Sequence, residues 1–136
     1  MFPQVAKAII HRKEHFLLQL RDDSPVISYP NQWSFFGGGI DPGETPWQAL
    51  QRELEEELEW RADQGSFLYH WINPEHPCQI HFFAVPFTGN QKQLILHEGQ
   101  AIDWFTLKEL LDNNAVAPHV KQHLVNFSNS YEIQSE

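Results

Sequence analysis

Cysteine and basic side chains are scarce in this chain of 136 residues. Its single cysteine, Cys78, excludes an intramolecular disulfide. Nine Lys and Arg residues stand against eighteen Asp and Glu, and the resulting net charge of -9 argues against nucleic acid or an anionic membrane as the main partner. The sequence also lacks a long apolar run and a leader in which charged residues precede an apolar stretch. We therefore expect a cytoplasmic protein with a small-molecule partner.

Internal repeats, low-complexity tracts and interdomain linkers are absent as well. A chain of this length is large enough for one hydrophobic core and too short for a second. We expect a single domain over residues 1–130 and a flexible tail over residues 131–136. Homodimers are common among small domains, so a homodimer stays open, although no feature of the sequence requires one.

Residues that could bind zinc occur in pairs only. Cys78 follows His76 closely, but two ligands do not make a closed zinc site, and an apolar strand is expected beside them. His119 and His123 are four residues apart on a predicted terminal helix, where such a pair is more often at the surface than bound to a metal. We predict no zinc site at either pair.

The clearest helix signal begins at residue 46. Thr45 is a typical N-cap, Pro46 suits the first helical position, and Gln48 completes a capping box. Apolar residues at spacings of three and four predict a face that packs on the core; they are Trp47, Leu50, Leu54 and Leu58.

A neighbouring face of the same helix carries Glu53, Glu56 and Glu57, at positions i, i+3 and i+4. Three carboxylates within one turn repel one another unless a cation lies between them, so we predict a site for Mg²⁺, with Mn²⁺ as the alternative. Arg52 could hold Glu56 through an i,i+4 contact. A solvated acidic face is the competing interpretation, and it is the one that we adopt for Glu55 and Glu59.

Glycines precede this helix and allow the backbone to approach a ligand closely; they are Gly37, Gly38, Gly39 and Gly43. A glycine-rich turn that feeds an acidic helix indicates a metal site directed at phosphates.

Residues 38–60 resemble the signature of the Nudix hydrolases. That signature is G-x5-E-x7-R-E-U-x-E-E-x-G-U, in which x is any residue and U is an aliphatic residue. The positions in register are Gly38, Glu44, Arg52, Glu53, Leu54, Glu56 and Glu57. Glu59 replaces the signature glycine and Trp60 the final aliphatic residue. The glycine normally ends the helix in a left-handed turn, so Glu59 either lets the helix continue or adopts that conformation at some cost.

The resemblance implies an α/β fold, the Nudix α/β/α sandwich with a mixed sheet. It also implies an Mg²⁺-dependent hydrolase that cleaves the pyrophosphate linkage of a nucleoside diphosphate derivative. Small one-domain members most resemble the branch that acts on nucleoside triphosphates, including oxidised ones. A nucleotide-sugar or ADP-ribose pyrophosphatase and a non-catalytic nucleotide sensor are the alternatives. The negative charge opposes a role in mRNA decapping.

The same resemblance implies roles for single residues. Glu53, Glu56 and Glu57 would bind the metal and serve catalysis, and Gly38 and Gly39 would contact the substrate. Glu44, like Arg52, would support the metal site from outside, although Glu44 could equally stabilise the helix N-terminus through its charge.

The general base differs among family members, being either a signature glutamate or a glutamate on a later loop. Glu98 is the candidate outside the signature, and a solvated loop residue is the alternative. Arg21 resembles a position that often faces substrate phosphates, or it forms a surface salt bridge. One of the aromatic residues near the long loop could stack on a base rather than pack in the core, namely Tyr29, Trp33 or Phe35.

Elsewhere, hydrophobic patterns and turn residues predict the remaining elements. Expected strands cover residues 5–11, 16–21, 33–36, 67–72, 79–87, 94–96 and 101–105. Expected helices cover residues 107–111, capped by Thr106, and 118–127. A long loop, residues 22–32, precedes the third strand.

Overall fold

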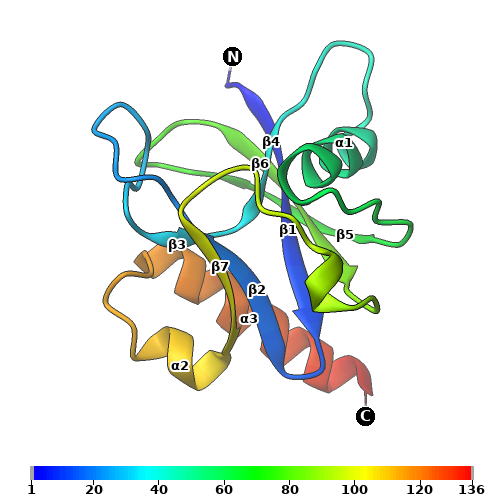
Figure 1. The fold of residues 1–136 in the computed structure, drawn as a ribbon, viewed down its shortest axis with the longest axis vertical. Helices are drawn as coiled ribbons and strands as arrows, with labels where there is room; N and C mark the ends of the chain where they lie inside the picture. Colours follow the sequence, from blue (N-terminus) through cyan, green and yellow to red (C-terminus); the bar gives the residue numbers. More distant parts are fainter. Residues whose placement is uncertain (1, 136) are drawn as a thin grey trace.

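The computed structural model describes the backbone of residues 2–135 and the side chains of residues 2–130. These residues form seven strands and three α-helices, which Figure 1 labels. The strands are β1 (Gln4–Arg12), β2 (His15–Leu20), β3 (Trp33–Ser34), β4 (Phe36–Gly39), β5 (Ser66–Ile72), β6 (Gln79–Pro86) and β7 (Ala101–Thr106). The helices are α1 (Pro46–Leu58), α2 (Leu107–Leu111) and α3 (Pro118–Ser135), and a short 3₁₀ turn covers Gln91–Gln93.

The sheet is mixed, because β1 and β6 run parallel while the other paired strands are antiparallel. The parallel register runs from Gln4 opposite Gln79 to His11 opposite Pro86. Strand β1 pairs with β4 along its first half and with β2 along its second half, so the sheet forks beside β1. This fork places β4 next to α1. Gly37, Gly38 and Gly39, which we expected in a turn, belong to β4 because their backbone pairs with β1.

Two hydrophobic clusters lie on opposite faces of the sheet. One cluster packs under α1 through Leu50, Leu54 and Leu58, as the apolar stripe predicts. The other includes Val120 and Leu124 of α3. In Figure 1, α1 and α3 accordingly lie apart, with the sheet between them. The expected α/β/α arrangement with a mixed sheet is confirmed.

Three boundaries differ from the sequence predictions. Residues 94–96 form no strand, because Ile95 N donates to Leu58 O at 3.0 Å and the segment binds the end of α1 rather than a strand. The expected strand at 33–36 is divided, since β3 pairs with β2 and β4 with β1. Helix α3 continues past Phe127 to Ser135, while residue 136 lies outside the described residues. The flexibility of the tail stays a prediction.

The remaining expected elements are found within one or two residues of the predicted bounds. Across residues 2–135, no helix combines the length and the apolar character needed to cross a bilayer.

Candidate active site

Helix α1 begins as its sequence predicts. The Thr45 hydroxyl accepts a hydrogen bond from Gln48 N at 3.1 Å, and the Gln48 amide oxygen accepts one from Thr45 N at 2.9 Å. Pro46 occupies the first turn. These two reciprocal bonds satisfy backbone donors that a helix start would otherwise leave free, and they anchor the acidic face.

The glycine-rich strand β4 lies directly against this face. A Cβ added to Gly38 would stand 2.5 Å from the carboxyl carbon of Glu53, whereas one added to Gly39 would meet no atom within 4 Å. Gly37 has φ 142°, and a Cβ there would lie 2.1 Å from Ala6 O. Glycine at positions 37 and 38 therefore lets β4 pack between β1 and the Glu53 carboxylate.

Arg52 joins the end of β4 to the helix. Its Nε and Nη2 atoms donate to the two carboxylate oxygens of Glu44 at 2.8 and 3.0 Å, and Nη2 also donates to Gly39 O at 3.0 Å. Nη1 donates to Glu53 Oε1 at 3.0 Å, while the expected contact with Glu56 is longer, at 3.4 Å. The hydrogen bonds from Arg52 lower the pKa of Glu44. Glu44 is thus the main partner of Arg52.

Glu57 is the buried member of the acidic trio. Its side chain is 3% exposed, and its Oε2 atom has no hydrogen-bond partner among the described residues. Burial, and next the adjacent carboxyl of Glu98, raise the pKa of Glu57 to about 10. The loop that carries Glu98 therefore brings a second carboxyl to the buried end of the acidic face.

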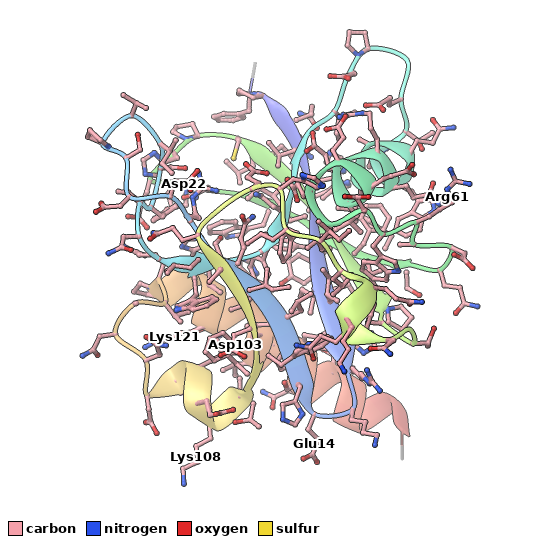
Figure 2. The ribbon with its side chains drawn as sticks, viewed as in Figure 1. Glu14, Asp22, Arg61, Asp103, Lys108 and Lys121 are labelled. Atoms are coloured by element: carbon pink, nitrogen blue, oxygen red, sulfur yellow. The ribbon has the colours of Figure 1, made fainter. Side chains whose placement is uncertain are left out.

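The other glutamates of α1 differ in their surroundings. The side chain of Glu56 is 59% exposed, and that of Glu53 is turned to Arg52. Glu55 lies on the outer face, where it is 3.4 Å from Arg61, a residue that projects away from the domain in Figure 2. The solvated interpretation therefore holds for Glu55. Glu59 is exposed to a similar extent, and its Oε2 atom lies 2.5 Å from His97 Nε2.

Within the described residues, no group of three or more Asp, Glu, His or Cys side chains surrounds one point as a metal cage would. The donors nevertheless suit a hard cation. Carboxylate oxygens are the ligands that Mg²⁺ prefers, and the unpartnered Oε2 of buried Glu57 calls for a positive partner. The assignment of Glu53, Glu56 and Glu57 as metal ligands stays a prediction.

A cavity of about 290 Å³ lies beside β4, and we call it the main cavity because it adjoins the acidic face of α1. A larger cavity of about 380 Å³ lies away from that face, between residues 59–61 and 87–89. Aromatic rings of Tyr29, Phe35 and Phe82 form part of its wall. Polar and charged side chains also reach it; they are Lys7, Arg21, Ser28, Ser34, Asn73, His76 and His119. Gly37 and Gly38 border the same space, so the cavity adjoins the residue that packs on Glu53.

The predicted substrate residues are distributed unequally around this cavity. Arg21 lines it while its Nε donates to Ser28 O at 2.7 Å, and Tyr29 lines it while its hydroxyl accepts from Asn73 Nδ2 at 3.1 Å. Gly38 borders it, but Gly39 is not among the lining residues. Trp33 is not among them either, because its ring packs edge-on against Phe105 at 4.9 Å in the core.

The surface interpretation of the two α3 histidines is wrong. His123 is 4% exposed, and its Nδ1 is 2.6 Å from the hydroxyl of Tyr69. His119 lines the main cavity and has a buried Nδ1 without a hydrogen-bond partner among the described residues. Burial, followed by the neighbouring His119, lowers the pKa of His123 to about 4. The sequence does contain a signal for this burial. His119, His123 and Phe127 follow one another at i+4 intervals and therefore lie on one face of the helix.

Two other cavity residues, Lys7 and Asn73, were not predicted. Lys7 alternates with Ala6 and Ala8 on β1 and points to the cavity face, and Asn73 follows β5 with 3% exposure. The signal for Lys7 was its position as a lone lysine in an apolar strand, between two alanines.

Comparison with known proteins identifies the fold and the family. A family model described as NUDIX domain matches residues 1–124. The chain belongs to the Nudix hydrolase family. This membership confirms the expected family and the expected class of enzyme, a hydrolase of phosphoric anhydride bonds.

Individual Nudix relatives are similar over most of the chain. A CTP pyrophosphohydrolase of Escherichia coli (strain K12) is 35% identical over 109 residues, which cover 79% of this chain and 78% of the relative. The E. coli ORF135 protein, known from a solution structure, is 31% identical, with a TM-score of 0.73. The match covers 94% of this chain and 89% of the ORF135 chain. The MutT protein of Methanosarcina mazei Go1 has a TM-score of 0.78 at 17% identity, covering 96% and 95% of the two chains, and shares the fold.

Proposed function

We propose that this Nudix protein hydrolyses the pyrophosphate linkage of nucleoside triphosphates, including oxidised ones, with Mg²⁺ or Mn²⁺ held by Glu53, Glu56 and Glu57. The observation that carries the proposal is the position of the main cavity. It borders Gly38, and Gly38 packs on the Glu53 carboxylate at the acidic face of α1. A nucleotide with its base in the cavity would have its phosphates beside these carboxylates.

The walls of the cavity suit a nucleobase. Flat apolar rings of Tyr29 and Phe35 offer stacking surfaces, while Asn73 and His119 supply polar groups that can fix the orientation of a base. Arg21 lies at the same cavity and is placed to meet the phosphates.

The size of the cavity favours a triphosphate over larger derivatives. Its volume of about 290 Å³ is at the lower limit of small-molecule sites, which span roughly 300–1,000 Å³. One base fits such a space, whereas the second bulky half of ADP-ribose, a nucleotide sugar or a dinucleotide would lie outside. The CTP pyrophosphohydrolase among the relatives agrees with a triphosphate substrate.

In the proposed reaction, water adds to a phosphorus atom while a phosphoric anhydride bond breaks. A divalent ion held by the carboxylates of α1 would neutralise charge on the phosphates and acidify bound water. Arg52 keeps Glu53 and Glu44 in place through hydrogen bonds from its guanidinium group. Glu98, adjacent to Glu57, is the residue that we assign as acceptor of the proton from the attacking water.

The test is turnover of a substrate panel with Mg²⁺. The panel holds the common nucleoside triphosphates, an oxidised guanine nucleotide, a nucleotide sugar, ADP-ribose, a dinucleoside polyphosphate and RNA with a 5′-triphosphate. Glu57→Gln is compared with Glu55→Gln, a matched change on the outer face of the same helix. We expect the first variant to lose about 100-fold or more in kcat and the second to keep the wild-type rate.

Binding of Mn²⁺, followed by calorimetry, separates the metal assignment from the choice of substrate. Equal affinities of the two variants for Mn²⁺ would refute a metal role for Glu57. Preference for ADP-ribose, a nucleotide sugar or RNA would replace the proposed substrate. Nucleotide binding without turnover across the whole panel would favour the sensor alternative.

A further inference from the structure

Helix α1 ends in an unusual way at Glu59. This residue is the C-cap and adopts the left-handed conformation, with φ 52° and ψ 37°, and its N–H donates to Glu55 O at 2.9 Å. Residues other than glycine are sterically disfavoured in this conformation. A carboxylate at a helix C-terminus also interacts unfavourably with the helix dipole. A glutamate at this position therefore needs a compensating contact.

The compensating contact is with His97. Oε2 of Glu59 lies 2.5 Å from Nε2 of His97, and both side chains are half exposed. Two backbone bonds lie beside this pair, since His97 N donates to Glu57 O at 2.8 Å and Ile95 N donates to Leu58 O at 3.0 Å. Three contacts thus join residues 95–97 to the last turn of α1 and satisfy its terminal carbonyls.

The other end of the same loop is also held. Gln100 N donates to Leu20 O at 2.8 Å, and Gly99, with φ 83°, leaves no room for a Cβ against that carbonyl. Glu98 is the one residue between these two attachments, and its carboxyl meets the buried carboxyl of Glu57. The Gln100 side chain strengthens this second attachment, because its Nε2 donates to Asn31 Oδ1 at 2.9 Å. The position of Glu98 consequently depends on both attachments, and the one at α1 rests on the side-chain pair of Glu59 and His97.

We propose that Glu59 and His97 are positioning residues that hold Glu98 against Glu57 and thereby set the rate of the hydrolysis. The proposal rests on the proposed function, because it assigns Glu98 to the reaction. Neither residue of the pair lines the main cavity, so neither is expected to bind the nucleotide.

The kinetic test uses Glu59→Gly, which removes the carboxylate and at the same time introduces the residue that a left-handed cap favours. We expect kcat to fall about 10-fold while KM stays within about 2-fold and the melting temperature is unchanged or higher. If Glu59 and His97 only stabilised the fold, kcat would instead change in parallel with the melting temperature. Glu55→Gln, exposed one turn earlier, is the control that keeps the wild-type rate.

Further variants test whether the two residues act together. His97→Ala should lose about as much in kcat as Glu59→Gly, and the double variant should lose no more than either alone. Glu59→Gln retains a hydrogen-bond acceptor for His97 and should recover most of the rate. Wild-type kcat in Glu59→Gly, or additive losses in the double variant, would overturn the proposal.

A measurement without substrate distinguishes this inference from the proposed function. Hydrogen exchange of the His97 and Ile95 amides, which bond to α1, should accelerate about 10-fold in Glu59→Gly. Unchanged exchange would refute the attachment. A wild type that turned over no substrate would refute the proposed function, while the exchange comparison would still decide whether the pair holds the loop.

Discussion

Gly38→Ala is the substitution that should damage the active site most selectively. The added Cβ would stand 2.5 Å from the carboxyl carbon of Glu53, about 1 Å short of the 3.4 Å at which ordinary contacts begin. Because the carboxylate is the far end of a side chain, it can move by that amount, but only by disturbing its 3.0 Å contact with Arg52. A misplacement of about 1 Å in a catalytic group costs roughly 100-fold in rate.

The fold should tolerate the same change. Gly38 does not have a positive φ, so alanine can adopt its backbone conformation and restrict the unfolded chain, a gain of about 0.4–1 kcal/mol. The ion pair of Arg52 and Glu53, whose side chains are 29% and 17% exposed, contributes about 1 kcal/mol, so the two effects nearly cancel. We expect an unfolding free energy within about 1 kcal/mol of wild type, measured by urea denaturation.

Gly39→Ala is the matched control, since a Cβ at that position meets nothing within 4 Å. The assay is release of phosphate or pyrophosphate from the preferred triphosphate at saturating Mg²⁺. The reasoning would be refuted if Gly38→Ala kept a rate within about threefold of wild type, or if Gly39→Ala were equally damaging.

Three more predictions concern the helix start, the arginine fork and the buried histidine. Thr45→Ala removes the acceptor for Gln48 N and should lower the unfolding free energy by about 1 kcal/mol in urea, whereas Thr45→Ser should change it little. Arg52→Lys keeps the charge but loses the two-pronged contact with Glu44; kcat/KM should fall about 10-fold, and an unchanged value would contradict the role of the fork. Because the pKa of His123 is about 4 in the fold and near 6.5 when unfolded, its contribution to stability is present above pH 6.5 and is lost as the pH falls toward 4. His123 should account for about 2 kcal/mol of the fall in unfolding free energy between pH 7 and pH 5, and His123→Gln should reduce the slope by that amount. The slope that remains belongs in part to His11, His81 and His119, whose pKa values burial also lowers.

Predictions from the sequence succeeded where the determinants are local. The start of α1 depends on Thr45 and Gln48, three residues apart, and the capping box forms as predicted. The strands of the central sheet were likewise recognisable from apolar and branched residues. Residues 94–96 show the limit of this approach. Their apolar pattern is compatible with a strand. The backbone N–H of Ile95, however, donates to the Leu58 carbonyl at the end of α1 and not to another strand.

The conformation of Glu59 also lay beyond the sequence. Helix continuation and a left-handed cap were both compatible with a glutamate in the glycine position. The choice between them depends on His97, 38 residues later, and spacing within one helix carries no information about such a partner.

Residue identity and helical spacing were sufficient to predict the Nudix signature, the order of carboxylates along α1 and the family to which the chain belongs. The tertiary structure alone decided which carboxylate is buried, which histidines enter the core and which residues enclose the main cavity. Burial and electrostatic surroundings arise when segments far apart in the chain pack together. Glu57 and Glu98, from α1 and a later loop, therefore acquire their joint chemistry only in the folded domain.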